Sequence, residues 1–236
     1  MTTIRKFQRL LLPLVIGCSL IPALGTLPAI AQQNRNDRSE FPGRRVGGGT
    51  RGSCPTNGSA LVALNPASNL GKTMSDRPSL YFLVPPLEAG YEVEFYLRDA
   101  HENPVYDTKL TSRGTEEIVE IQLPSNTVST DQDYHWFFVV VCDPLDRTQN
   151  MTLEGWLRRV EAVETLRAIA PPSSIEETVA LARAYWQAEI WTDAIALMVN
   201  LRQANPANAA LQQQWTQLLQ ALELSHTVEQ IQANQL

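Results

Sequence analysis

Short apolar runs separated by Pro, Gly, Asn and Asp extend from Ser59 to about Ala162, a pattern typical of β-strands. In two of these runs, 91–98 and 119–123, apolar and polar positions alternate, as in a strand with one buried face. The number of short runs predicts an immunoglobulin-like antiparallel β-sandwich over residues 59–162. The expected strands are Ala60–Leu64, Ser79–Val84, Tyr91–Arg98, Val105–Leu110, Glu117–Leu123, Tyr134–Cys142 and Met151–Val160.

The run Tyr134–Cys142 is apolar on both of its faces. A strand of this kind needs cover on both sides, so we expect the outer face of its sheet to be covered by bulk packing, either by the C-terminal helices or by a partner. Tyr134 also stands where a tyrosine corner would form, with its hydroxyl bonded to backbone upstream.

Residues 175–224 change to a helical period, and Ser174 with Glu177 forms a capping box in front of the first helix. The spacing of Leu181, Ala182, Tyr185, Ala194 and Pro206 is that of a tetratricopeptide repeat, although Glu189 stands where a turn glycine is usual. The pattern predicts a small tetratricopeptide-like hairpin with a capping helix over 163–224, followed by a tail at 225–236. A plain αα-hairpin is the alternative. The predicted fold class is therefore α+β.

The N-terminus reads as an export signal, because a basic start is followed by an apolar stretch and by Ala29-Ile30-Ala31. We expect a signal peptide at 1–31 that is cleaved after Ala31, and a periplasmic or extracellular location. A lipid anchor on Cys18, within a lipoprotein-like box, is the alternative. A Gly- and Arg-rich segment, 32–58, reads as a flexible lead-in, and no later stretch is long enough for a transmembrane segment.

Export leaves two cysteines, Cys54 and Cys142. An even pair in an oxidising compartment predicts a disulfide bond. The alternative is two unrelated buried thiols.

Charge and composition exclude some partners. The chain has 19 basic and 25 acidic residues, for a net charge of −6, and removal of the leader would make it more negative. An acidic protein is a poor match for the phosphate backbone, so we expect no nucleic-acid partner. The 44% apolar content is that of an ordinary globular protein.

Several motifs together resemble a family of exported cyanobacterial proteins defined only as a domain of unknown function, number nine hundred and twenty-eight. The resemblance covers roughly residues 44–222 and implies a location in the cyanobacterial envelope. It implies no activity, ligand or catalytic residue. The motifs that carry it are Gly47–Gly52, Leu70–Thr73, Asp76–Pro78, Val105-Tyr106, Tyr134–Trp136, Cys142–Pro144, Glu154–Glu161, Trp191–Ala194 and Leu201-Arg202.

Residues that could carry catalysis form no recognisable set. The three histidines, His101, His135 and His226, have no metal-ligand spacing, and Cys142 near His135 is better explained by a disulfide. Turn-forming aspartates flank the run Tyr134–Cys142 without a calcium-loop pattern, and the glycines near Cys54 lack the lysine of a phosphate loop. We expect no cofactor and no enzymatic activity.

The leading hypothesis is a non-enzymatic module that binds an unidentified protein of the cell envelope. Its candidate contact residues are Phe137, Trp156, Tyr185 and Trp191. A carbohydrate-binding module for cell-wall or extracellular polysaccharide is the alternative, and a hydrolase is less favoured.

Overall fold

The computed structural model describes residues 41–47, 54, 60–87, 90–114 and 117–225. The chain divides into two compact units, Met1–Asn36 and Asp37–Leu236, and all the described residues belong to the second. They form two β-sheets and four α-helices, which confirms the α+β class. The expected signal peptide, with Cys18 and Ala31, lies outside the described residues, as does most of the C-terminal tail.

All seven expected strands are present, within one or two residues of their predicted bounds, and two short strands, β1 and β3, join them. A four-stranded sheet has the order β1-β2-β4-β7, and a five-stranded sheet has the order β3-β9-β8-β5-β6. Every pair is antiparallel except β3 with β9. The strands are β1 (Val46–Gly47), β2 (Leu61–Ala63), β3 (Leu70–Thr73), β4 (Ser79–Val84), β5 (Glu92–Asp99), β6 (Pro104–Thr111), β7 (Glu117–Gln122), β8 (Asp133–Val140) and β9 (Met151–Arg159).

The two sheets enclose one hydrophobic core. At its centre the Phe82 ring of β4 stacks on Phe138 of β8, with 4.0 Å between ring centroids, and meets Trp136 edge-on at 5.4 Å. Aromatic pairs of this kind add to the stabilisation from burial alone. Gly155 of β9 makes room for the Trp136 ring, because a Cβ there would lie 2.3 Å from it.

Tyr134 forms the corner expected from its position. Its hydroxyl accepts a hydrogen bond from the backbone N–H of Ser129 at 2.9 Å, while the ring is buried in the core. The bond ties the loop before β8 to the start of that strand.

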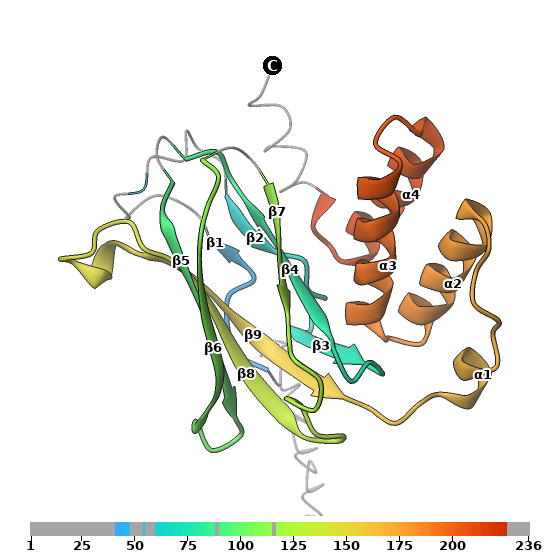
Figure 1. Ribbon diagram of the computed structural model, residues 1–236, viewed down its shortest axis with the longest axis horizontal. Coiled ribbons are helices and arrows are strands. Elements are labelled where there is room, and N and C mark those ends of the chain that lie inside the picture. The colour runs from blue at the N-terminus through green and yellow to red at the C-terminus, as the bar shows by residue number, and fades with distance from the viewer. Residues whose placement is uncertain (1–40, 48–53, 55–59, 88–89, 115–116, 226–236) are drawn as a thin grey trace, which may run out of the picture. The chain divides into compact units, whose positions relative to one another are not determined.

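Four helices follow the strands, at the right of Figure 1: α1 (Glu164–Arg167), α2 (Ile175–Gln187), α3 (Trp191–Ala204) and α4 (Ala209–Ala221). The expected capping box is present, because Ser174 Oγ accepts from the backbone N–H of Glu177 at 3.1 Å. Asn208 caps α4 in the same way. The short helix α1 has no counterpart in the sequence prediction. Among the described residues, none of the helices has the length and hydropathy to cross a membrane.

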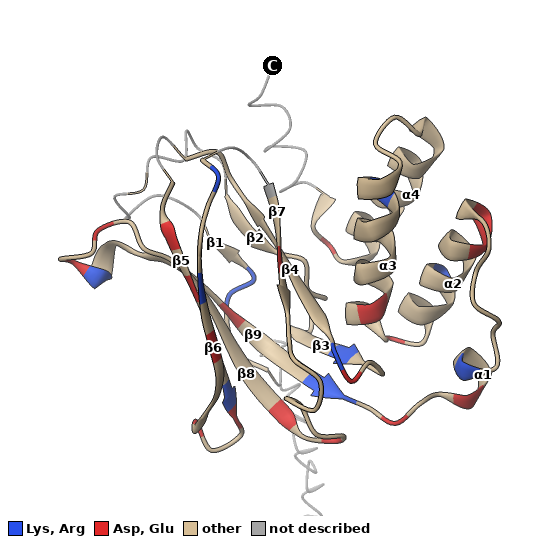
Figure 2. Ribbon diagram, in the orientation of Figure 1, with Lys and Arg blue, Asp and Glu red and all other residues tan. Residues whose placement is uncertain are grey.

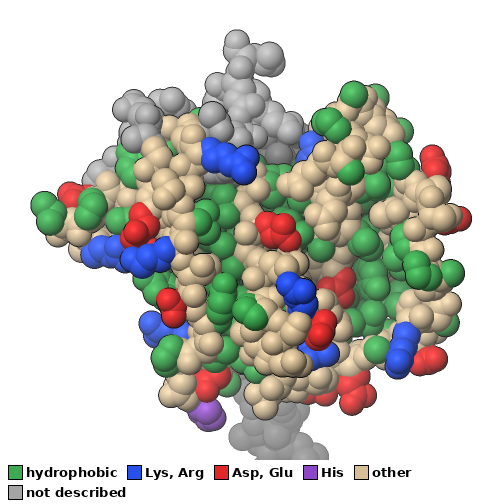
Figure 3. Space-filling view, viewed as in Figure 1, with side chains coloured by type: hydrophobic (Ala, Val, Ile, Leu, Met, Phe, Trp, Pro, Cys, Tyr) green, Lys and Arg blue, Asp and Glu red, His purple; other side chains and the backbone are tan. Residues whose placement is uncertain are grey.

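The helices cover the outer face of the four-stranded sheet. Tyr81 and Leu83 of β4 point away from the inter-sheet core and are buried against residues of α3 and α4, among them Met198 and Leu218. Hydrophobic side chains fill the space between the helices and the sheets (Figure 3). This corrects the expectation that the helices cover the sheet of β8. They lie on the other sheet, because β4 too is apolar on both faces.

A buried polar joint fixes α3 to the end of β3. The Asp193 carboxylate accepts from the Thr73 hydroxyl at 2.5 Å and from the Met74 backbone N–H at 2.8 Å. Burial raises the pKa of Asp193, and the two hydrogen bonds oppose that shift. On the exposed side of the same joint, Lys72 pairs with Glu189 at 2.8 Å.

Residues 41–47 differ from the prediction of a flexible lead-in. They form β1 and an extended strap along β9, with paired backbone hydrogen bonds between Arg44 and Glu154. The Arg45 guanidinium donates to the carbonyls of Asn65 and Leu222, and so joins the strap to the C-terminal end of α4. The strap thus connects the two sheets and the helices.

Cys54 and Cys142 form the expected disulfide bond, with their Cα atoms 5.0 Å apart and a sequence separation of 88. Both side chains adjoin the inter-sheet core.

Reduction of this disulfide should destabilise the protein. The bond closes a long loop and so lowers the conformational entropy of the unfolded chain. The double variant Cys54→Ser with Cys142→Ser should therefore lower the free energy of unfolding by about 4 kcal/mol. Guanidinium unfolding of the native chain with and without reductant measures the loss. An unchanged unfolding midpoint would show that the bond does not constrain the fold.

Asp193→Ala should weaken the docking of the helices. The substitution leaves the Thr73 hydroxyl and the Met74 N–H without their acceptor, at a cost of about 2 kcal/mol in unfolding free energy. Glu189→Ala is the matched control, because the exposed pair with Lys72 should contribute less than about 1 kcal/mol. Equal losses from the two variants would contradict a special role for the buried joint.

Candidate functional site

The outer face of the five-stranded sheet carries a row of aromatic side chains that none of the described helices covers. His135 stacks on Trp156 of the neighbouring strand with 4.3 Å between ring centroids and an interplanar angle of 2°. Phe137, on the same strand as His135, lies 4.2 Å from the His135 ring. All three side chains are partly exposed. We call Phe41, His135, Phe137 and Trp156 the aromatic row.

The N-terminal strap fixes one end of the aromatic row. The Trp156 indole N–H donates to the Pro42 carbonyl at 2.9 Å, and the Phe41 ring meets the indole edge-on at 5.7 Å. The Arg158 guanidinium lies over the Phe41 ring at 5.6 Å. The indole is therefore held in one orientation, with one ring face against His135.

Charged side chains next to the aromatic row are joined in ion pairs. Arg158 binds the Asp133 carboxylate through two nitrogens, at 2.5 and 2.7 Å. Arg98 lies over the Phe137 ring at 5.3 Å and pairs with Glu102 at 3.4 Å. Acidic and basic side chains are interspersed along these strands (Figure 2). The result is a pre-organised surface with little uncompensated charge.

His135 lies between two carboxylates. Its Nδ1 is 3.0 Å from Glu102, while its buried Nε2 has no hydrogen-bond partner and lies 3.8 Å from Glu154. The imidazole thus places one carboxylate near each of its ring nitrogens, at the centre of the aromatic row.

Beyond the aromatic row, the same face holds a buried carboxylate, Glu94 of β5. It accepts hydrogen bonds from Tyr96 at 2.7 Å, from Lys109 at 2.9 Å and from Arg147. Arg147 comes from a one-turn 3-10 helix, Arg147–Gln149, in the loop before β9. Burial alone would raise the pKa of Glu94, but the three hydrogen bonds outweigh it and lower the pKa to about 2.

Two of the four candidate contact residues lie elsewhere. Tyr185 of α2 and Trp191 of α3 are half-buried within the helical layer, and Trp191 packs on the cluster that joins the helices to the sheet. Burial raises the pKa of the Tyr185 phenol, as does the nearby charge of Asp193. Of the predicted residues, the structure therefore brings together Phe137 and Trp156, through His135.

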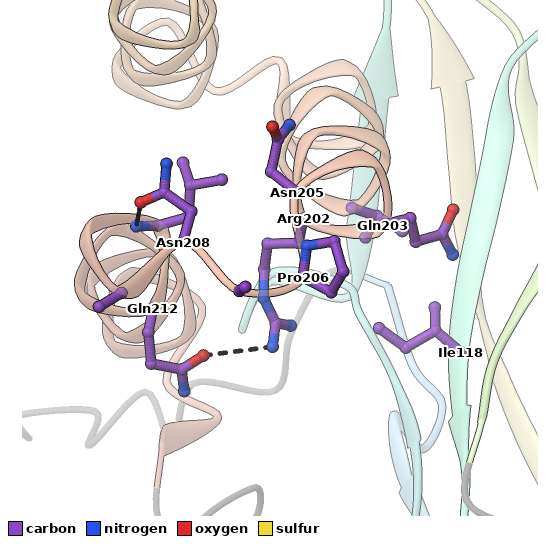
Figure 4. Close-up of a pocket in the computed structure, with 11 residues that line it drawn as sticks. Ile118, Arg202, Gln203, Asn205, Pro206, Asn208 and Gln212 are labelled. Carbon is purple, nitrogen blue, oxygen red and sulfur yellow. Dashed lines mark hydrogen bonds between the residues drawn. The ribbon is translucent and has the colours of Figure 1, made fainter.

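A second candidate site is a cavity of about 550 Å³ between β7 and the turn that joins α3 to α4. Figure 4 shows the Arg202 guanidinium between Gln212 of α4 and Ile118 of β7. Four amide side chains, of Gln203, Asn205, Asn208 and Gln212, line the cavity together with apolar groups such as Val199 and Leu211. No carboxylate is among its lining residues.

The residues considered for catalysis do not converge in the described part of the chain. Cys142 is oxidised and adjoins the core, whereas His135 is on the outer face of the sheet. His101 lies in the turn after β5, and His226 is outside the described residues. No group of three metal-ligating side chains occurs among the described residues, and the cavity beside Arg202 has no carboxylate in its lining.

Sequence reasoning missed the cavity and the charged groups of the sheet. Glu94 and Tyr96 are on the polar face of a correctly predicted strand, so the alternation could have placed them on the surface with Phe137. Arg202 belongs to a motif that carries the family resemblance, but the motif assigns it no role, and a basic residue in the last turn of a helix is usual.

Comparison with protein families identifies a match over most of the chain. The model for a family described as Domain of Unknown Function (DUF928) matches residues 46–232, a span that includes both sheets and the helices. No curated protein matches the chain.

The Glu94 cluster should make stability depend on acid pH. Because the folded-state pKa lies below the ordinary value of 4.5, the contribution is present above about pH 4.5 and is lost as the pH falls toward 2. Glu94→Gln should cost about 2 kcal/mol of unfolding free energy at pH 7 and flatten this dependence. Glu92→Gln is the control, since the Glu92 side chain is half-exposed and pairs with Lys109 at the surface. Identical pH profiles for Glu94→Gln and the unmodified chain would contradict the assignment.

Proposed function

We propose, on the premise that the chain belongs to the DUF928 family of unknown function, that it is an exported, non-enzymatic module that binds another protein of the cell envelope. The contact surface is the aromatic row with its flanking arginines, Arg98 and Arg158. The family supplies no activity, so the proposal depends on the chemistry of this surface.

The observation that carries the proposal is the uncovered aromatic row on the five-stranded sheet. Trp and Arg are the residue types most enriched among those that dominate protein–protein binding energy. Here Trp156, Phe137 and two arginines lie on three adjacent strands. The helices, which would be the natural cover, are already packed on the other sheet.

The surface is also held in place before any partner binds. Ion pairs orient Arg158 and Arg98, and the strap orients Trp156. Side chains that are already ordered lose little rotamer entropy on binding, which favours affinity. A polar, ion-paired rim around aromatic side chains is the usual composition of a protein interface.

Export is supported by the disulfide bond, because such bonds persist in oxidising compartments. Together with the leader-like N-terminus, this favours a periplasmic or extracellular location. A lipid on Cys18 would keep the same location but tether the chain to a membrane.

Strand order supports the immunoglobulin-like interpretation of the two sheets. Three central strands of the larger sheet, β5, β8 and β9, correspond to C, F and G of such a sandwich, and Tyr134 supplies the corner. The antiparallel α2–α3 hairpin followed by α4 supports the tetratricopeptide-like interpretation. Both scaffolds are used for binding, but a fold by itself assigns no function.

A glycan is the second candidate ligand, favoured by one observation. Trp156 and Tyr96 are on the same outer face as the carboxylates Glu102 and Glu154, and a sugar can stack on an indole while its hydroxyls bond to carboxylates. Binding of the native chain to cell-wall or extracellular polysaccharides on a glycan array, lost in Trp156→Ala, would favour this candidate over the first.

The protein-binding proposal is tested by capture of partners from an envelope fraction with the native chain. Phe137→Ala should weaken binding of the captured protein at least about 30-fold, the effect of losing a residue that contributes about 2 kcal/mol. Tyr185→Ala is the matched control, because it truncates a half-buried aromatic ring away from this surface. If nothing is enriched, or if both variants weaken binding only in proportion to lost stability, the proposal is wrong.

A further inference from the structure

The cavity beside Arg202 is lined by both a cationic and several apolar side chains, and the proposed function assigns it no role. Its lining combines apolar side chains of Ile118, Val199 and Leu211 with the Arg202 guanidinium and four amides. A volume of about 550 Å³ is within the range of small-ligand pockets.

Arg202 is half-buried and forms no ion pair with any described carboxylate. Its Nη2 donates to Gln212 Oε1 at 3.3 Å, and its guanidinium lies 4.4 Å above the Trp215 ring. Partial burial lowers the pKa of Arg202, with no acidic neighbour to oppose the shift. Holding a cation away from water without a counter-charge is costly, and the stacked indole fixes the plane of its remaining donors.

Two other half-buried arginines, Arg45 and Arg158, differ from Arg202 in this respect. Arg45 is engaged by backbone carbonyls of three residues, and Arg158 binds the Asp133 carboxylate through two nitrogens. Among the described residues, the Arg202 guanidinium donates one hydrogen bond, to Gln212, and lies over one aromatic ring, that of Trp215. Most of its five N–H donors are therefore available to a ligand in the cavity.

The amides add donors of their own. Gln212 uses Oε1 to accept from Arg202, and Asn208 uses Oδ1 to accept from the backbone N–H groups of Ala210 and Leu211. This leaves the NH₂ group of each as a donor at the cavity. A site with a cation, amide donors and no carboxylate is complementary to an anion that has two acceptor oxygens in one plane.

We propose that this cavity binds a carboxylate that is attached to an apolar group, with Arg202 as the residue that recognises the carboxylate. The apolar group lies against Ile118, Val199 and Leu211. The carboxylate belongs either to a free small acid or to the C-terminus of a peptide, because both present the same oxygens. This site is independent of the aromatic row, so either proposal can fail alone.

The test compares acids with their neutral amides on the unmodified native chain. The probes are N-acetyl-leucine and acetyl-Ala-Ala-Leu, each as the free acid and as the C-terminal amide, followed by calorimetric titration. We expect each acid to bind at least about 10-fold more tightly than its amide, a difference of about 1.4 kcal/mol. A peptide acid that binds 10-fold more tightly than N-acetyl-leucine identifies a protein C-terminus as the ligand, and equal affinities identify a small acid.

Variants then locate the binding. Arg202→Gln should abolish the preference for the acid, and Arg202→Lys should retain only part of it, because lysine lacks the planar pair of donors. Arg183→Gln is the matched control: Arg183 also stacks near a tryptophan and bonds to glutamines, but it is exposed and does not line the cavity.

Two results would overturn the proposal. One is that neither acid binds with a Kd below about 10 mM. The other is that acid and amide bind equally to the unmodified chain, a comparison that does not depend on whether the variants fold. A preference for the acid that survives in Arg202→Gln would place the carboxylate elsewhere and also contradict the assignment.

Discussion

A sheet that is apolar on both faces must be covered on both, and this requirement decides how the chain is arranged. Each of the two sheets supplies one face to the common core. The outer side of the four-stranded sheet is covered by α3 and its neighbours, through Tyr81, Leu83 and the residues that pack on them. The outer side of the five-stranded sheet receives no helix among the described elements, and the proposed function follows from that difference.

On the five-stranded sheet, long polar and charged side chains cover the outer face in place of helices. Arg98 lies over Phe137, while Arg147, Lys109 and Tyr96 close around Glu94. This cover is thin and ion-paired, and it leaves the aromatic row partly exposed. Such a surface is stable in water, and the exclusion of water from it by a partner would still contribute favourable binding free energy. The helical layer differs, because its apolar residues are buried against the four-stranded sheet. The cavity of Arg202 lies at its α3–α4 turn.

Local patterns were sufficient to predict most of the elements. Apolar runs separated by turn residues located seven of the nine strands, and Ser174 marked the start of α2. The strands that were missed are short: β1 has two residues, and β3 contains a glycine and shows no alternation. Their pairing with β2 and β9 depends on contacts distant in sequence.

The arrangement of the candidate sites was less predictable. Phe137 and Trp156 were correctly singled out, but they become neighbours only through the register of β8 with β9. The sequence also did not decide which of the two sheets the helices cover, because β4 and β8 are both apolar on two faces. The two strands differ only in the strands and helices that pack beside them. The cavity of Arg202 could not be predicted, since it is formed by the α3–α4 turn together with a strand distant in sequence.

The most direct test is side-chain footprinting of the native chain in intact envelopes and after purification. If the outer face of the five-stranded sheet holds a partner, labelling of Phe137 and Trp156 is lower in the envelope, while labelling of Tyr185 and Trp191 is the same in both states. Equal labelling of Phe137 and Trp156 in the two states, or protection confined to the helices, would contradict the account.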